Sequence, residues 1–193
     1  MNENEWTETI KELLQSSELG EEIEVSILTK LPYTMEVTSF NLNFKPRTRS
    51  SLPFETDLLV YEKSAEAIVP RVVIEAKLGS ITTHDAITYS YKAQSHKSII
   101  PFLRYGIMIG NRGHYPLPGR LFRHGSNFDF MISFCGEKAN DLEKKSFVEL
   151  VKKEILYSKQ MEEIILKTRS SDRERYFLLQ KELHLKKLDD VHL

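Results

Sequence analysis

The chain has 193 residues, of which 40% are hydrophobic and 28% are charged. This composition is typical of one folded domain and excludes an intrinsically disordered chain. The single cysteine, Cys135, excludes an intramolecular disulfide and a cluster of thiolate ligands, as is typical of a reducing compartment. The N-terminus is acidic and unlike a secretory signal, and no apolar run approaches the roughly 18 residues of a membrane span, so we expect a cytoplasmic protein without a membrane segment.

The net charge of −1 hides an uneven distribution along the chain. Residues 1–24 contain eight acidic residues and one lysine, which leaves the remaining residues with a net charge of +6. Between Asp85 and Asp129 there is no acidic residue, whereas six lysines and arginines occur there. If this acid-free stretch shares one surface, it forms a patch that attracts phosphate groups.

Helical and strand-like patterns alternate along the first hundred residues. Apolar residues at helical spacing predict an amphipathic helix over residues 4–18. Four segments with alternating or continuous apolar residues predict strands, with a basic loop at residues 45–53 between the second and the third. The predicted strands cover residues 22–30, 35–44, 57–61 and 69–78. A second helix is predicted over residues 84–97.

Two further strands are predicted at residues 105–109 and 128–134, with a loop rich in Gly, Pro, Arg and His over residues 111–127 between them. The strands on either side of the helix at 84–97 require a crossover connection. The order therefore predicts an α/β fold, with a three-layer α/β/α core over residues 1–136 and a central mixed sheet.

From residue 137 to residue 193 the pattern is helical. A long stripe of apolar residues marks one helix, and Ser171 with Glu174 resembles a capping box that begins a second helix over residues 173–187. These helices predict a C-terminal extension that packs on the core or on a second subunit, within a single domain overall.

The strand at residues 69–78 carries an acid and a base side by side. Its period of two places Val72, Ile74 and Ala76 on one apolar face, and Glu75 and Lys77 on the other. A buried carboxylate or ammonium group without a partner costs several kcal/mol, so this pair requires a partner, a metal or a cleft.

Asp57, at the start of the preceding strand, can supply a second carboxylate beside Glu75. Two carboxylates are hard oxygen ligands that suit Mg²⁺, with Mn²⁺ as a substitute, and the carbonyl of Ala76 can add another oxygen. Such a metal polarises a phosphate and lowers the pKa of a bound water, and Lys77 can orient or deprotonate that water.

These residues resemble the pattern of the PD-(D/E)XK nuclease superfamily, which includes many restriction endonucleases. The pattern reads Pro53-Phe54-Glu55-Thr56-Asp57, followed 18 positions after Asp57 by Glu75-Ala76-Lys77, and the resemblance covers about residues 5–134. It implies a restriction-endonuclease-like fold, with Asp57 and Glu75 as metal-binding acids and Lys77 as the catalytic lysine. Thr56 stands where many members have proline. Many members also take an acid from the first helix, which Glu12 or Glu5 can supply.

Several side chains are candidates for contacts with nucleic acid. Lys92 and Gln94 lie on the helix after the motif, and three arginines lie in the loop at residues 111–127, where a guanidinium can bind guanine or phosphate. These arginines are Arg112, Arg120 and Arg123. The alternatives are an exposed helical lysine and a merely solvated loop. The six histidines show no recognisable ligand spacing, which disfavours a zinc site.

We therefore expect a Mg²⁺-dependent endodeoxyribonuclease that acts on double-stranded DNA as a homodimer, most simply a type II restriction endonuclease. A repair or recombination nuclease of the same fold is one alternative, because a fold does not fix a substrate. The other alternative, from a different class, is a non-catalytic subunit that binds nucleic acid.

Overall fold

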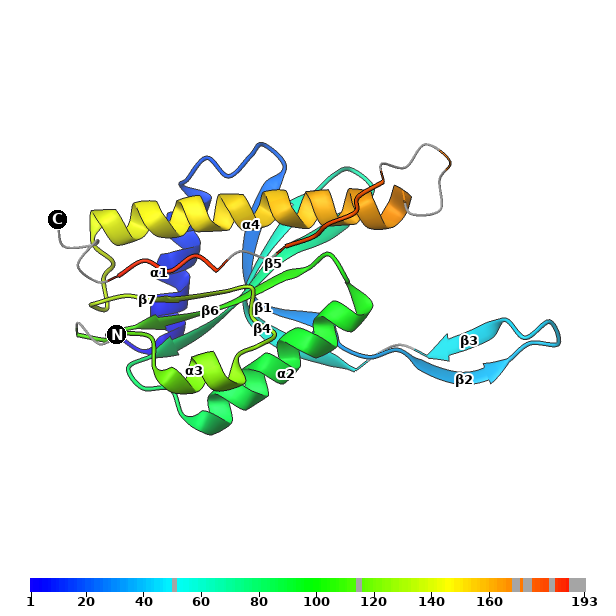
Figure 1. Ribbon diagram of the computed structural model, residues 1–193, viewed down its shortest axis with the longest axis horizontal. Helices are drawn as coiled ribbons and strands as arrows, with labels where there is room; N and C mark the ends of the chain where they lie inside the picture. The colour runs from blue at the N-terminus through cyan, green and yellow to red at the C-terminus, as the bar shows by residue number, and fades with distance from the viewer. Residues whose placement is uncertain (50–51, 114–115, 168–170, 172–174, 181–182, 188–193) are drawn as a thin grey trace.

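The computed structural model describes residues 1–49, 52–113, 116–167, 171, 175–180 and 183–187 (Figure 1). Its helices are α1 (Glu3–Gln15), α2 (Thr83–Ile99), α3 (Gly119–His124) and α4 (Asp141–Lys167). Its strands are β1 (Ile23–Pro32), β2 (Glu36–Phe40), β3 (Pro46–Arg49), β4 (Pro53–Lys63), β5 (Ile68–Leu78), β6 (Arg104–Gly110) and β7 (Phe130–Ser133). No helix in the described ranges is both long and apolar enough to cross a membrane.

The main sheet has five strands in the order β1-β4-β5-β6-β7. The pairs β1–β4 and β4–β5 are antiparallel, whereas β5–β6 and β6–β7 are parallel. The crossover through α2 joins β5 to its parallel neighbour β6, as its position between two strands predicted. The mixed sheet of the predicted α/β fold is therefore confirmed.

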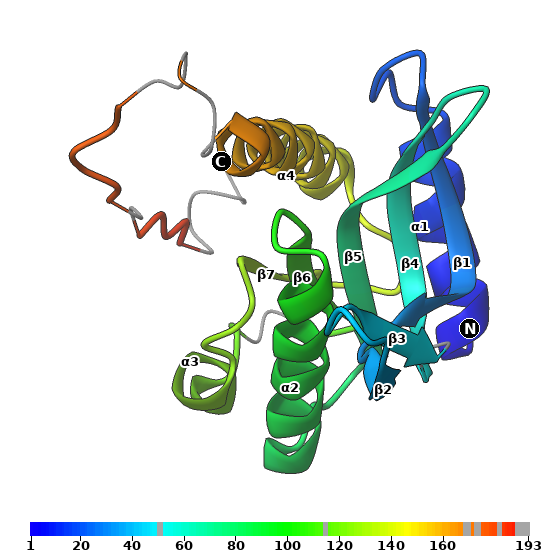
Figure 2. The same ribbon diagram turned by 90° about the vertical axis from the view of Figure 1, so that its right-hand side faces the viewer.

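Helices cover both faces of this sheet, as Figure 2 shows from the side. On one face, α1 and α4 pack Trp6, Ile10 and Phe147 against apolar side chains of β4 and β5. On the other face, α2 and α3 pack Ala93 and Leu121 against side chains such as those of β6. The predicted arrangement of three layers is confirmed, and α4 is one part of it.

Three segments differ from the sequence-based predictions. The strand predicted at residues 35–44 and the following loop form the hairpin of β2 and β3, which pairs only within itself in the described structure. The loop predicted at residues 111–127 contains the short helix α3. The helix predicted at residues 173–187 is wrong for its described part, residues 175–180 and 183–187, which are not helical. Its apolar side chains, such as Phe177, are exposed, and a short helix without packing is marginal in water.

Candidate functional site

The site lies where β4 and β5 separate. Their antiparallel ladder includes the pair Leu58↔Ile74, and the same register would place Asp57 opposite Glu75. Instead of a backbone pair at that position, the side chain of Asp57 accepts the backbone N–H of Ala76 through Oδ2 at 2.7 Å. The carboxylate thus takes the place of a ladder carbonyl and is fixed beside Glu75.

Glu75 is completely buried, at 0% exposed. The hydroxyl of Tyr105 donates to its Oε1, and Nζ of Lys92 lies 2.8 Å from the same oxygen. Its Oε2 has no hydrogen-bond partner among the described residues. Burial, reinforced by the charge of Asp57 and partly offset by Lys92 and Tyr105, raises the pKa of Glu75 to about 7.

Lys77 is held between two helices. Its Nζ lies 3.3 Å from Oε1 of Glu3 in α1 and 5.4 Å from the ring centroid of Tyr89 in α2. Burial lowers the pKa of Lys77, but Tyr89 and Glu3 outweigh burial, so that the pKa lies above its ordinary value. The ammonium group therefore stays charged at neutral pH.

The acid that the first helix brings to the site is Glu3. Besides its contact with Lys77, Glu3 accepts the backbone N–H of Leu78 through Oε2 at 3.2 Å. Glu12 lies nine residues further along α1, a displacement of about 13 Å that also turns its side chain to the opposite side of the helix. Glu5 binds the backbone N–H of Asn2 in the capping box of α1. The structure therefore does not bring Glu12 or Glu5 to Lys77.

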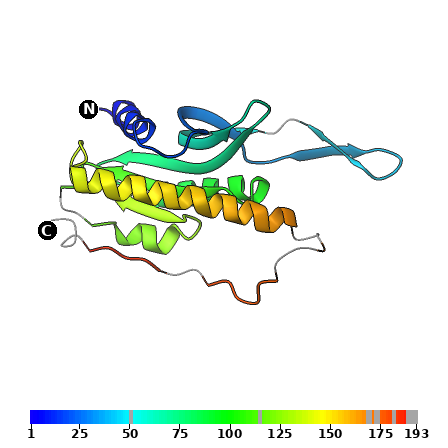
Figure 3. The same cartoon turned by 90° about the horizontal axis from the view of Figure 1, so that it is seen from above.

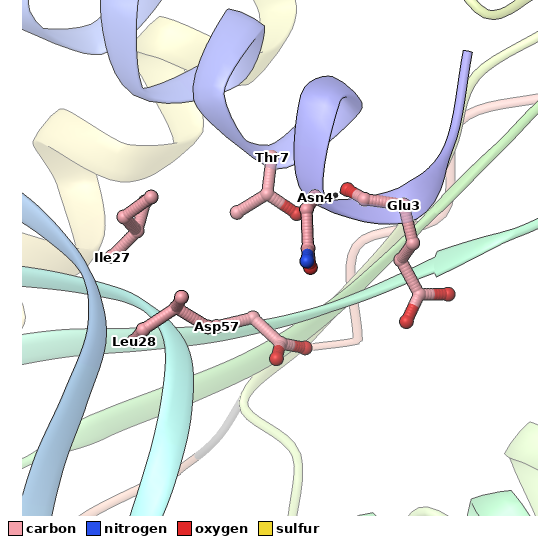
Figure 4. A pocket seen from close by; sticks show the side chains of 6 residues that line it. All are labelled: Glu3, Asn4, Thr7, Ile27, Leu28 and Asp57. Atoms are coloured by element: carbon pink, nitrogen blue, oxygen red, sulfur yellow. Dashed lines mark hydrogen bonds between the residues drawn. The ribbon is translucent and has the colours of Figure 1, made fainter.

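Figure 4 shows a small hollow between α1, β1 and β4 on the Asp57 side of the site. Glu3 and Asn4 extend from the first turn of α1 towards the strand that carries Asp57. The cavity volume of about 20 Å³ is close to that of a single water site. The side chains of Glu3 and Asp57 therefore border the same small space.

The side chains expected to contact nucleic acid have different surroundings. Lys92, besides its ion pair with Glu75, donates to the carbonyl of Glu55 at 2.8 Å, and its side chain is only 13% exposed. Arg112 donates to the carbonyl of Gly79 and Arg120 donates to that of Ile81. Lys92 thus belongs to the site, and the two arginines bind the loop after β5.

Gln94 and Arg123 line an open groove between α2 and α3, with a volume of about 350 Å³. Both side chains are exposed there. The acid-free stretch does not form one free basic surface, because Lys97 and Arg104 pair with Asp129 at 2.6 and 3.1 Å. The groove is therefore lined by only some of the basic side chains of the acid-free stretch, which were expected to share one surface.

The site offers carboxylate oxygens as ligands for a metal ion. In the described part of the chain, no group of three or more His, Cys, Asp or Glu side chains is arranged to hold a metal ion. Two carboxylates, Asp57 and Glu75, do lie together, and Oε2 of Glu75 is a buried oxygen that lacks a donor. Mg²⁺ often binds one or two carboxylates and completes its shell with water and phosphate, so this pair fits Mg²⁺.

Comparison with known proteins gives similarity of structure and no match of sequence. No protein-family model matches the chain, and no curated protein matches its sequence. Among solved structures, the chain is similar to the pre-specific restriction endonuclease BsaWI in complex with DNA, with 11% sequence identity and a TM-score of 0.47. The similarity covers 88% of this chain and 68% of that one. A function for this chain therefore has to be argued from Asp57, Glu75 and Lys77 themselves.

Proposed function

We propose that this protein is a Mg²⁺-dependent endonuclease that hydrolyses phosphodiester bonds in duplex DNA. The observation that carries the proposal is the meeting of Asp57 and Glu75 where β4 and β5 separate, with Lys77 next on the same face of β5. The residues are those that resemble the nuclease pattern in the sequence. A Glu-x-Lys sequence that occurs by chance would not be expected to have an aspartate from another strand beside it.

Asp57, Glu75 and the carbonyl of Ala76 would hold the metal. When bound, Mg²⁺ supplies a Lewis acid that polarises a phosphate oxygen and lowers the pKa of a coordinated water. Tyr105 and Lys92 fix the orientation of Glu75 by binding its Oε1, which leaves Oε2 for the ion. These two residues act through Glu75 and are positioning residues.

Lys77 acts through its positive charge. Because Tyr89 and Glu3 raise its pKa, Lys77 is protonated at neutral pH and is poorly suited to be a general base in this arrangement. A fixed ammonium group can orient the attacking water and offset the charge that develops on the phosphate. Glu3 keeps that group in place from α1.

The finer proposal is a type II restriction endonuclease that acts as a homodimer, because two antiparallel strands suit two active sites related by a two-fold axis. A repair or recombination nuclease is the alternative on the same site. A non-catalytic protein that binds nucleic acid is the second candidate function. One observation favours it, since the ion pair with Lys92 already partly neutralises Glu75.

The test is cleavage of a supercoiled plasmid with Mg²⁺, with Mn²⁺ and with a chelator. We expect Lys77→Ala and Asp57→Asn to lower the cleavage rate at least about a hundredfold, the loss typical for one electrostatic group in an active site. Discrete fragments favour restriction, structure-dependent nicking favours repair, and binding without cleavage favours the non-catalytic protein.

Two exposed residues of α4 provide matched controls, Lys152→Ala and Asp141→Asn. Both should cleave like the unmodified protein, because both side chains are exposed on α4, which contributes no residue to the proposed site. Undiminished cleavage by Lys77→Ala or by Asp57→Asn would remove that residue from the mechanism. Folding of each variant is checked by its thermal unfolding.

A further inference from the structure

The hairpin of β2 and β3 projects from the body as an arm, here defined as residues 33–49 (Figures 1 and 3). All five residues of β2 are exposed. An isolated two-stranded hairpin is at best marginally stable in water, so an arm of this kind is typically stabilised by a partner. The charge of the arm and the side chains at its tip indicate the kind of partner that it binds.

The second half of the arm carries exposed basic side chains. Lys45, at the end of the turn, and Arg47, in β3, are both exposed. Glu36, at the start of β2, is the acid of the arm. Residues 33–49 contain one acid against three lysines and arginines, a net charge of +2. The arm thus carries a positive charge although the whole chain does not.

The tip of the arm presents two apolar side chains to solvent. Leu42 is completely exposed and Phe44 is 85% exposed. Oδ1 of Asn41 accepts the backbone N–H groups of Asn43 and Lys45, each at 2.9 Å, which orders the turn. Phe44 has a φ of 57°, a conformation that costs a bulky residue free energy. An ordered turn that holds a phenylalanine outwards at such a cost indicates a contact for that ring.

We propose that the arm binds duplex DNA, with Lys45 and Arg47 against the phosphates and with Leu42 and Phe44 inserted between base pairs. This inference rests on the proposed function for its ligand. β-Ribbon proteins place their strands in the major or the minor groove, and in minor-groove proteins apolar wedges such as Leu or Phe unstack base steps and bend the duplex.

The position of the arm favours the same ligand. The arm leads into β4 at Pro53, and Asp57 lies four residues further along that strand, a rise of about 13 Å. DNA that reaches the site would therefore pass near the base of the arm. A second copy of the chain is the weaker candidate. The exposed rings of Phe40 and Phe44, of about 200 Å² each, supply about half of the 800 Å² that one partner buries in a standard interface.

The experiment measures affinity and bending with a duplex of about 30 base pairs that carries a fluorophore pair at its ends, in a chelator so that no cleavage occurs. The full chain is compared with Leu42→Ser/Phe44→Asn, because asparagine tolerates the left-handed backbone at residue 44. We expect this variant to bind the duplex at least tenfold more weakly. We also expect it to lose the change in energy transfer between the two fluorophores that bending of the duplex causes. We expect Lys45→Ser/Arg47→Ser to reduce the slope of log K against log salt concentration by about 2.

The matched control for the variant of the apolar tip is Leu166→Ser, and the matched control for the variant of the basic side chains is Lys145→Ser/Lys152→Ser. All three control residues are exposed on α4. Unchanged affinity and bending in both arm variants would overturn the inference, and so would a failure of the unmodified chain to bind DNA. The inference would also be overturned, in favour of a second copy of the chain as the partner, if the arm variants lost self-association but kept their affinity for DNA. If the chain binds DNA through the arm but does not cleave it with Mg²⁺, only the proposed nuclease function is refuted. If the arm variants bind and cleave DNA as the unmodified chain does, only this inference is refuted.

Discussion

At the scale of single residues, Glu3 is the informative member of the site. It reaches Lys77 and the backbone of Leu78 from the first turn of α1, so it connects α1 to the end of β5. Replacement by glutamine keeps the size of the side chain and removes its charge. The consequence falls on the position of the Lys77 ammonium group, and therefore on catalysis more than on folding.

We predict that Glu3→Gln lowers the cleavage rate about tenfold, because a hydrogen bond to a charged group contributes about 1.5–3 kcal/mol and only part of it is lost. Glu5→Gln and Glu12→Gln are matched controls on the same helix, and both should cleave at the unmodified rate. Initial rates on plasmid DNA at saturating Mg²⁺ measure the difference. Equal rates for all three variants would assign Glu3 to surface packing only.

A second residue, His96, makes stability depend on pH. It is completely buried, its Nε2 lies 3.2 Å from the carbonyl of Leu31, and the rings of Phe54 and Tyr105 lie beside it. Burial lowers the pKa of His96 to about 4, and the charge of Lys92 also lowers it. Between about pH 4 and pH 6.5 the unfolded chain therefore binds more protons than the folded one.

The contribution of His96 to the free energy of unfolding should consequently fall by about 1–2 kcal/mol as the pH is lowered from about 7 to about 5. His96→Gln can keep the hydrogen bond to Leu31 but does not titrate, so the difference in free energy of unfolding between the unmodified protein and this variant should shrink by that amount over the same pH range. Urea denaturation of both proteins at several pH values measures this difference. Parallel curves would mean that His96 keeps its ordinary pKa in the folded chain.

At the scale of elements, the parallel strands β6 and β7 approach closely at a glycine. A Cβ atom on Gly106 would lie 2.2 Å from the ring of Phe130, its cross-strand partner. Because Phe130 belongs to the core, the ring has little room to move away. Gly106 is therefore required by packing between neighbouring strands.

We predict that Gly106→Ala lowers the free energy of unfolding by about 3 kcal/mol, as is usual for overpacking of a tight core. Gly119→Ala is the control, since its Cβ would meet only the guanidinium of Arg123 at 3.8 Å or beyond. That variant should change stability by less than about 0.5 kcal/mol, or stabilise α3 slightly. Urea denaturation checks both values, and an unaffected Gly106→Ala would show that β7 can shift.

A comparison of β5 with the arm shows which features of a strand its sequence periodicity can predict. The period of two placed Glu75 and Lys77 on one face of a strand, because an apolar face must meet the core. The same alternation in residues 35–44 could not tell whether the strand joins the main sheet or pairs only with β3, since both give alternation. The position of an element in the sheet is set by tertiary contacts that a local pattern does not contain.

The same limit explains the differences at the site. The partner of Lys92 could not be inferred from its helix, because Glu75 reaches it from β5. Glu3 could not be selected among the acids of residues 1–18, because the docking of α1 decides which acid faces Lys77. Asn2 and Glu5, the residues of a capping box, would have located the first turn.

At the scale of the whole molecule, the helical extension and the N-terminal helix share one core. Trp6 of α1 packs edge-on against Phe134, and Phe134 packs in the same way against Phe147 of α4, with ring centroids 5.9 and 5.5 Å apart. All three side chains are at most 1% exposed. The first and last described helices are therefore coupled through β7 and its following residue.

We predict that Phe147→Ala lowers the free energy of unfolding by about 3–5 kcal/mol, the cost of removing a large buried ring. Because the chain has a single tryptophan, the fluorescence of Trp6 reports on α1, while far-ultraviolet circular dichroism reports on all helices. Both probes should shift to the same lower urea midpoint if α4 belongs to one cooperative unit. Leu166→Ala, at an exposed position of α4, should leave the midpoint unchanged. A tryptophan transition that stays in place while the dichroism shifts would mean that residues 137–167 unfold as a separate unit, and that α1 and the strands hold the site without them.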